Sequence, residues 1–172
     1  MSHASSSTVT SNGLSPEQLR LHQEAALSFD WETGDLRHLG VTMSKFGLDL
    51  ATAIRVFLNG TPDVFNHLHR DEVPLTMTAR VAMLDCLHMK IGCGFYLPDP
   101  AVGLASVRSE AEAWFERQAQ DRAQGITGRW TFDEARFRAI SDDGPKQLIM
   151  APTKTPKSAI WRTLFVPMWV RA

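Results

Sequence analysis

The spacing of apolar residues along the chain predicts mainly α-helix. The pattern is clearest in residues 49–59, where apolar side chains recur at the intervals that place them on one face of a helix: Ala53, Ile54, Phe57 and Leu58. Gly60 follows directly, as a residue type that commonly ends a helix. A second apolar series predicts a helix that starts at Thr76 or Thr78 and ends at Gly92, with its inward side formed by Val81, Leu84, Leu87 and Ile91.

Capping residues predict where the remaining helices begin. Ser15 is a good N-cap, Pro16 suits the first helical position, and Gln18 completes a capping box, so a helix is expected to about residue 28. By the same reasoning, further helical segments are expected over 36–47, after Thr61-Pro62, from Asp99-Pro100 to about Gln124, and from Thr131 to Ile140. Together these segments predict a compact bundle of about six helices.

The last part of the chain has a different pattern. Residues 142–145 predict a turn, and the apolar segments 148–150 and 160–170 are rich in β-branched and aromatic residues. Prolines limit any strands there to short or edge positions, so a small hairpin or an extended arm lying on the helices is expected. Residues 1–13 are small and polar and predict a disordered tail. The expected organisation is a single domain over residues 14–172, mainly α with a small C-terminal β or extended addition.

Composition and charge narrow the function only slightly. Of the 172 residues 44% are hydrophobic, which is enough for one core without metal or disulfide. The formal net charge of −1 gives the whole chain no strong attraction to nucleic acid or acidic lipid. Residues 1–100 carry seven Lys and Arg against eleven Asp and Glu, whereas residues 101–172 carry eleven against eight. Either these charges are only solvated, or one half of the chain provides a contact surface.

The two cysteines, Cys86 and Cys93, are too few for a secreted disulfide scaffold. Met1–Thr10 lacks the basic and apolar regions of a signal peptide, and no window approaches about 18 continuous apolar residues. We therefore expect a cytoplasmic protein with reduced thiols that does not span a membrane.

Four short motifs occur in a fixed order: Trp31-Glu-Thr-Gly34, Thr52-Ala53 within a helix ending at Phe57, Gly60-x-Pro62, and Gly94-Phe-Tyr96. In this order they resemble the bacterial family called domain of unknown function 4274, over roughly residues 21–98. The chain departs from that family at positions 32 and 33, where an acidic pair is common, and in its long C-terminal part, residues 99–172.

The resemblance implies a compact helical domain. That family has no established activity, so no catalytic residue is carried over to this chain. Small bacterial families of this kind often resemble immunity proteins that accompany secreted toxins, which is an analogy at the level of the family.

Trp31 and Gly34 have two interpretations. In one, Trp31 packs the first two helices together and Gly34 takes a positive φ. In the other, Trp31 is an exposed residue that contacts a partner.

The carboxylates near Trp31 are equally ambiguous. They either cap the next helix and are otherwise solvated, or they attract a basic partner such as a nuclease toxin. Two carboxylates further along the chain would belong to the same acidic surface. The candidate partner-binding residues are therefore Asp30, Trp31, Glu32, Asp35, Asp71 and Glu72.

Histidines and cysteines form the other candidate group: His67, His69, Cys86, His88 and Cys93. Zinc uses these ligand types, but on a helix the rings of His67 and His69 would point about 200° apart. Cys86 and Cys93 lie about two helical turns apart, and Cys86 is by default a small core residue. Cys93 lies near a helix C-terminus, where the dipole disfavours a thiolate. We therefore expect no metal, no cofactor and no catalytic residue, with a metal-dependent or cysteine-based enzyme as the alternative.

A second alternative, a nucleic-acid accessory protein, follows from basic and aromatic residues that alternate in the C-terminal part: Arg129, Trp130, Arg136, Arg138, Lys146, Lys154, Lys157, Trp161, Arg162, Trp169 and Arg171. No known binding-module pattern accompanies them, and the chain has no Gly-rich phosphate loop and no Gly-x-Ser-x-Gly motif. The sequence-based hypothesis is therefore a non-enzymatic bacterial protein that binds another protein, most concretely an immunity protein that neutralises a cognate toxin.

Overall fold

The structure is a computed structural model and describes residues 14–142. Six α-helices lie within this part of the chain: α1 (Pro16–Leu27), α2 (Leu36–Thr42), α3 (Leu50–Asn59), α4 (Thr78–Gly92), α5 (Arg108–Ala123) and α6 (Glu134–Asp142). Loops and four 3-10 turns join them: η1 (Pro62–Val64), η2 (Arg70–Glu72), η3 (Leu75–Met77) and η4 (Ala105–Val107). The predicted mainly α fold is confirmed. The predicted disordered tail and the C-terminal hairpin or arm lie outside the described residues.

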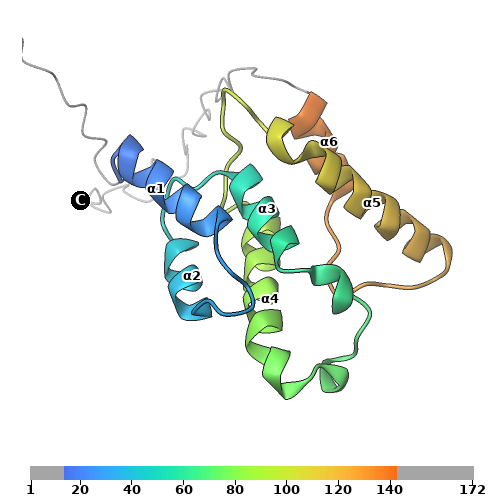
Figure 1. Ribbon diagram of the computed structural model, residues 1–172. Coiled ribbons are helices and arrows are strands. Elements are labelled where there is room, and N and C mark those ends of the chain that lie inside the picture. The colour runs from blue at the N-terminus through green and yellow to red at the C-terminus, as the bar shows by residue number, and fades with distance from the viewer. Residues whose placement is uncertain (1–13, 143–172) are drawn as a thin grey trace, which may run out of the picture.

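Helices α3 and α4 pack against each other at the centre of the molecule, with α1 and α2 on one side and α5 and α6 on the other (Figure 1). Seven of the ten residues of α3 are buried, as its nearly continuous apolar sequence requires. One hydrophobic cluster contains residues from both the 21–98 part and the 99–142 part. The C-terminal part up to residue 142 therefore shares the core of the family-like part.

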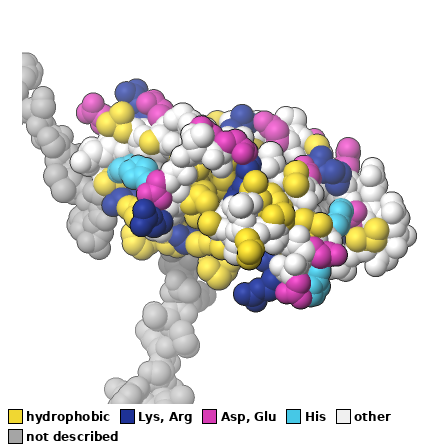
Figure 2. Space-filling view, turned by 60° about the horizontal axis from the view of Figure 1, so that its bottom comes forward, with side chains coloured by type: hydrophobic (Ala, Val, Ile, Leu, Met, Phe, Trp, Pro, Cys, Tyr) yellow, Lys and Arg dark blue, Asp and Glu magenta, His cyan; other side chains and the backbone are white. Residues whose placement is uncertain are grey.

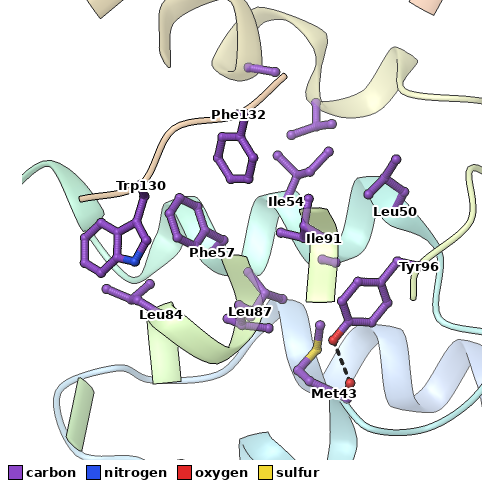
Figure 3. Packing of buried hydrophobic residues seen from close by; sticks show 14 of the residues in the cluster. Met43, Leu50, Ile54, Phe57, Leu84, Leu87, Ile91, Tyr96, Trp130 and Phe132 are labelled. Carbon is purple, nitrogen blue, oxygen red and sulfur yellow. Dashed lines mark hydrogen bonds between the residues drawn. The ribbon is translucent and has the colours of Figure 1, made fainter. Parts of the chain in front are cut away.

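Figure 3 shows Phe57, Trp130 and Phe132 grouped at one end of the core and Tyr96 beside Met43 at the other. At the aromatic end, the ring of Phe57 meets Trp114, Trp130 and Phe132 edge-on, with centroid distances of 5.6, 5.7 and 5.3 Å. At the other end, the hydroxyl of Tyr96 donates a hydrogen bond of 2.6 Å to the carbonyl oxygen of Met43. Burial raises the pKa of Tyr96, so this hydroxyl stays protonated and remains a donor.

Side-chain caps confirm several predicted helix starts. Ser15 and Gln18 form the expected capping box at α1. Asp35 caps α2 by accepting a hydrogen bond from the Arg37 amide. Asp49 caps α3 by accepting from the Thr52 amide at 2.9 Å. These caps use partners two or three residues away, which is why the sequence alone reveals them.

Several predicted caps and helix starts are wrong. Asp99 does not begin a helix, because its carboxylate and carbonyl accept backbone hydrogen bonds that close a tight turn at Gly103, and α5 starts only at Arg108. Helix α4 starts at Thr78, as predicted, but neither Thr76 nor Thr78 caps it through its side chain. At α6 the cap is Asp133, which accepts from the Arg136 amide, and not Thr131. The segment after Thr61 forms only the short turn η1.

Gly34 and Gly60 are required for close packing and not for an unusual φ. Gly34 is not among the residues with positive φ, so that prediction is wrong. A Cβ on Gly34 would lie 2.4 Å from the carbonyl oxygen of Asp30, and one on Gly60 would lie 2.7 Å from a methyl carbon of Leu84. Gly34 therefore lets the turn at 30–34 close against Asp30 and the Phe29 ring, and Gly60 lets the end of α3 approach α4.

Candidate functional site

Trp31 belongs to the core and is not an exposed contact residue. Its side chain is 9% exposed, and its ring meets Phe29 edge-on with the centroids 5.8 Å apart. A Cβ on Gly60 would lie 3.0 Å from the same ring, so the indole packs directly against the end of α3. The interpretation of Trp31 as an anchor for a partner is therefore wrong.

Two of the candidate carboxylates shape the turn between α1 and α2. The Asp30 carboxylate accepts hydrogen bonds from the Thr33 hydroxyl and from the backbone amides of Glu32 and Thr33. These hydrogen bonds, the Thr33 hydroxyl first, lower the pKa of Asp30. The hydrogen bond from the Arg37 amide lowers the pKa of Asp35 in the same way. Both groups stay ionised to unusually low pH, and both contribute negative charge at the surface.

Glu32 pairs with an arginine that sequence reasoning did not identify. A guanidinium nitrogen of Arg80, in the first turn of α4, lies 2.7 Å from the Glu32 carboxylate. Arg80 is buried, whereas the Glu32 side chain is 71% exposed. The signal in the sequence was the position of Arg80, four residues before Leu84 on the inward side of a helix, where a cation requires partners.

Arg80 finds those partners at the end of α3. Its Nε donates to the Gly60 carbonyl at 3.1 Å and its Nη2 donates to the Thr61 hydroxyl at 2.9 Å. Thr61 has a φ of +50°, a left-handed conformation that side chains rarely adopt. Arg80 therefore ties the turn at Glu32 and a strained residue after α3 to the first turn of α4.

Asp71 and Glu72 lie on η2, directly before α4. The Glu72 carboxylate accepts a hydrogen bond of 2.6 Å from the His69 amide, which shapes the turn. Asp71 is exposed and lies 3.5 Å from the exposed imidazole of His69. Solvent screens such a pair strongly, so Asp71 remains available to another partner.

A groove of about 520 Å³ opens beside these two residues. Its walls come from η2, η3, the first half of α4 and the loop at 129: Arg70, Asp71, Val73, Leu75, Thr78, Val81, Ala82, Asp85 and Arg129. Leu75 is 94% exposed. Its position beside the groove makes Leu75 a candidate contact residue.

We group Glu32, Asp71, Glu72 and Leu75, which lie on segments beside the start of α4, under the name α4-start face. The ion pair with Arg80 brings Glu32 to the first turn of α4, and η2 and η3 lead directly into that helix. Figure 2 looks onto the end of the molecule where α4 begins, with hydrophobic side chains in the middle of the view and charged and histidine side chains towards both sides. Of the six candidate residues, the structure thus gathers three carboxylates around one helix start.

Arg129 and Trp130 both form hydrogen bonds that stabilise the fold. Arg129 donates to both oxygens of Asp85 at 2.8 and 2.6 Å, and the Trp130 indole donates to the same carboxylate at 2.8 Å. Burial by itself raises the pKa of Asp85, but the hydrogen bonds from Arg129 and Trp130 outweigh it, and the pKa of Asp85 is lowered. Arg136 donates to the Gly92 carbonyl at 2.8 Å. The residues of this set from Lys146 to Arg171 lie outside the described residues.

The histidines point to different partners. His67 is hydrogen-bonded to Asp121 at 2.8 Å, between two hollows of about 300 and 310 Å³. His88 donates to the Thr131 carbonyl at 2.8 Å, with its ring against Phe132. Over residues 14–142, no three His, Cys, Asp or Glu side chains are grouped so that they could hold a metal ion.

Cys86 and Cys93 are both free thiols. Cys86 is partly buried in α4, whereas Cys93 is exposed just after it and its Sγ contacts the Lys90 carbonyl at 3.4 Å.

Among the described helices, none has both the length and the apolar character needed to cross a bilayer. Comparisons with protein-family models, with curated proteins and with solved structures found no match. The resemblance over residues 21–98 therefore stays a prediction from the sequence motifs.

Proposed function

We propose that this protein acts by binding another protein at the α4-start face, without catalysing a reaction. The observation that carries this proposal is Leu75, which is 94% exposed at the edge of a groove of about 520 Å³. An exposed leucine costs hydrophobic free energy in the isolated protein, and a partner that covers it recovers that free energy. A groove beside it offers room for an apolar side chain of the partner.

The charges around Leu75 define the chemistry of the partner. Glu32 and Asp71 extend into solvent, and Glu72 lies between Asp71 and Leu75 in the chain. An apolar centre with a polar rim is the usual anatomy of a protein interface. Carboxylates at the rim favour a basic partner and accelerate its association. The partner that fits this face presents an apolar side chain flanked by Lys or Arg.

The most concrete form of this proposal is an immunity protein of the bacterial cytoplasm. Its partner would be a basic toxin, such as a nuclease, whose nucleic-acid-binding surface is covered when the complex forms. The acidic rim supports this version, because a nuclease surface that binds phosphates is itself basic. The resemblance of residues 21–98 to a small bacterial family supports it by analogy.

The test compares two leucine substitutions in the full chain. Tagged wild-type protein, Leu75→Asp and Leu21→Asp are purified from the native host and weighed by native mass spectrometry, and the partner is identified from the wild-type complex. Leu21 is also exposed but lies on α1, so Leu21→Asp is the matched control. We expect a one-to-one complex with the wild type and the control, and at least a tenfold weaker complex with Leu75→Asp.

Charge reversal tests the rim separately. Asp71→Lys should weaken binding and reduce its dependence on salt concentration, measured by titration calorimetry at two ionic strengths. Equal affinity of the wild type, Leu75→Asp and Asp71→Lys for the same partner would refute binding through this face. A wild-type protein that is purified alone, and that binds no candidate basic protein in titration, would refute the proposed function itself.

A further inference from the structure

A second apolar surface lies at the opposite end of α4. Phe46 is 74% exposed and Leu97 is 70% exposed, although both are large apolar residues. The partly buried ring of Phe95 lies beside Phe46, with the centroids 5.6 Å apart. We call these three residues, Phe46, Phe95 and Leu97, the Phe46 patch.

The backbone holds this patch firmly in place. Residues around Asp49 and Leu97 run side by side as a short parallel pair, and the Leu50 amide donates to the Leu97 carbonyl at 2.9 Å. Side chains alternate along such an extended segment, so the buried Tyr96 points inward while Phe95 and Leu97 lie on the outer side. The outward positions of Phe95 and Leu97 therefore follow from the backbone pairing at Asp49.

The described chain ends next to this region. Arg136 of α6 donates to the Gly92 carbonyl, and the carbonyl oxygen of Ile140 would lie 3.8 Å from a Cβ on Gly103. Helix α6 thus runs beside the loop from 92 to 103 that carries Phe95 and Leu97. The described part of the chain ends at Asp142, the last residue of α6.

The sequence that follows contains a segment suited to cover the patch. Residues 160–170 read IWRTLFVPMWV, in which every residue except Arg162 and Thr163 is apolar. Residues 143–159 separate this segment from α6 and could span at most about 60 Å when fully extended, which exceeds the diameter of a domain of this size. We propose that residues 160–170 dock on the Phe46 patch of the same chain.

Covalent connection favours this occupant over a second copy of the chain. Two apolar surfaces joined by a short linker meet at an effective concentration on the order of millimolar, far above the concentration of free protein in a dilute solution. Docking removes the exposed side chains of Phe46 and Leu97 from water, and this apolar burial stabilises the contact. The patch follows the C-terminal end of α4, about 22 Å along the helix from its first turn, so the α4-start face stays open.

Site-specific photocrosslinking in the full chain tests the proposal. Phe46 is replaced by the photoreactive residue benzoylphenylalanine, and in a matched control Leu75 is replaced by the same residue. Dilute purified protein is irradiated, and the adducts are located by peptide mass spectrometry. We expect most adducts from position 46 to join residues 160–170 within one chain, and at least tenfold fewer from position 75.

A double substitution in residues 160–170 controls for crosslinking by chance contact. The variant combines Phe165→Ser and Trp169→Ser with the photoreactive residue at position 46. It should give no adduct, while its far-UV circular dichroism stays unchanged. Adducts to a second copy of the chain, equal yields from positions 46 and 75, or adducts that avoid residues 160–170 would each overturn the proposal. The outcome is independent of partner binding, because no partner is present in the experiment.

Discussion

Two clusters on either side of α4 use the same three kinds of residue. The first cluster lies at the start of the helix and contains Trp31, Glu32 and Arg80. The second lies near the middle of the helix and contains Trp130, Asp85 and Arg129. In both, the guanidinium lies 5.6 Å from the centre of the indole ring. The clusters differ in which member is buried, and this difference decides what each can contribute.

In the first cluster the cation is buried and the carboxylate extends into water. Arg80 satisfies the Gly60 carbonyl and the Thr61 hydroxyl as well as Glu32, while the indole nitrogen of Trp31 is buried without a hydrogen-bond partner among the described residues. In the second cluster the carboxylate is the centre, because Asp85 accepts hydrogen bonds from both Arg129 and the Trp130 indole. The first cluster therefore depends on its arginine, and the second depends on its aspartate.

Substitution of the two arginines should give the largest difference in stability between the clusters. Arg80→Met is expected to lower the free energy of unfolding by about 3 kcal/mol, because it leaves the Gly60 carbonyl without its charged donor in a buried site. Arg129→Met is expected to cost about 1 kcal/mol, since Asp85 keeps the Trp130 indole and access to water. Urea unfolding of both variants measures the difference. Equal losses would show that burial of the cation does not distinguish the clusters.

The two tryptophans should differ by a smaller amount. Trp130→Phe removes both core volume and the donor to Asp85, with an expected loss of about 2 kcal/mol. Trp31→Phe removes similar volume but an indole N–H that has no partner, so about 1 kcal/mol is expected. Thermal and urea unfolding of the two variants against the wild type gives the values. A larger loss for Trp31→Phe would contradict the role assigned to the indole of Trp130.

Acid should affect the second cluster through Asp85. The pKa of Asp85 is lowered in the folded protein, so its contribution to stability is complete above its unfolded value of about 3.9 and is lost as the pH falls through the folded pKa. Asp85→Asn should therefore make stability less dependent on pH below about 4. Asp30, Asp35 and Glu110 also have lowered pKa values and leave a residual slope of the same sign. Urea midpoints between pH 7 and pH 3 test this, and an unchanged slope in Asp85→Asn would contradict it.

The smallest effect on stability is expected at Glu32. Its carboxylate is 71% exposed, and an ion pair so open to water contributes at most about 0.5 kcal/mol. Glu32→Gln should therefore leave the urea midpoint nearly unchanged while it weakens the binding of a basic partner at low salt. A loss of stability above about 1 kcal/mol would mean that Glu32 is mainly part of the fold. That result would remove it from the α4-start face.

Local rules predict the parts of this fold whose causes are local. The caps at Ser15 and Asp49 are correct because donor and acceptor lie within three residues of each other. The start at Asp99 is wrong because an Asp-Pro pair suits both a helix cap and a tight turn. The burial of Leu104 and Val107 in the core accompanies the turn and delays α5 to Arg108. That choice depends on neighbours distant in the sequence.

The candidate site shows the same division. Composition and turn chemistry are enough to name Glu32, Asp71 and Glu72 as acidic surface residues. They do not reveal that Trp31 is buried or that Leu75 is exposed, because exposure depends on which helices pack above each side chain. The partners of Glu32 and His67 are 48 and 54 residues away, so no local pattern identifies them.

By itself the sequence determined the helical class, most helix positions and the acidic character of the front half, because periodicity and capping act over a few residues. Only the tertiary structure decided which of two tryptophan–arginine–carboxylate clusters buries its cation, which carboxylates gather at the start of α4, and which apolar residues stay exposed. These outcomes depend on the packing of whole helices against one another, and burial and hydrogen-bond partners exist only after that packing is complete.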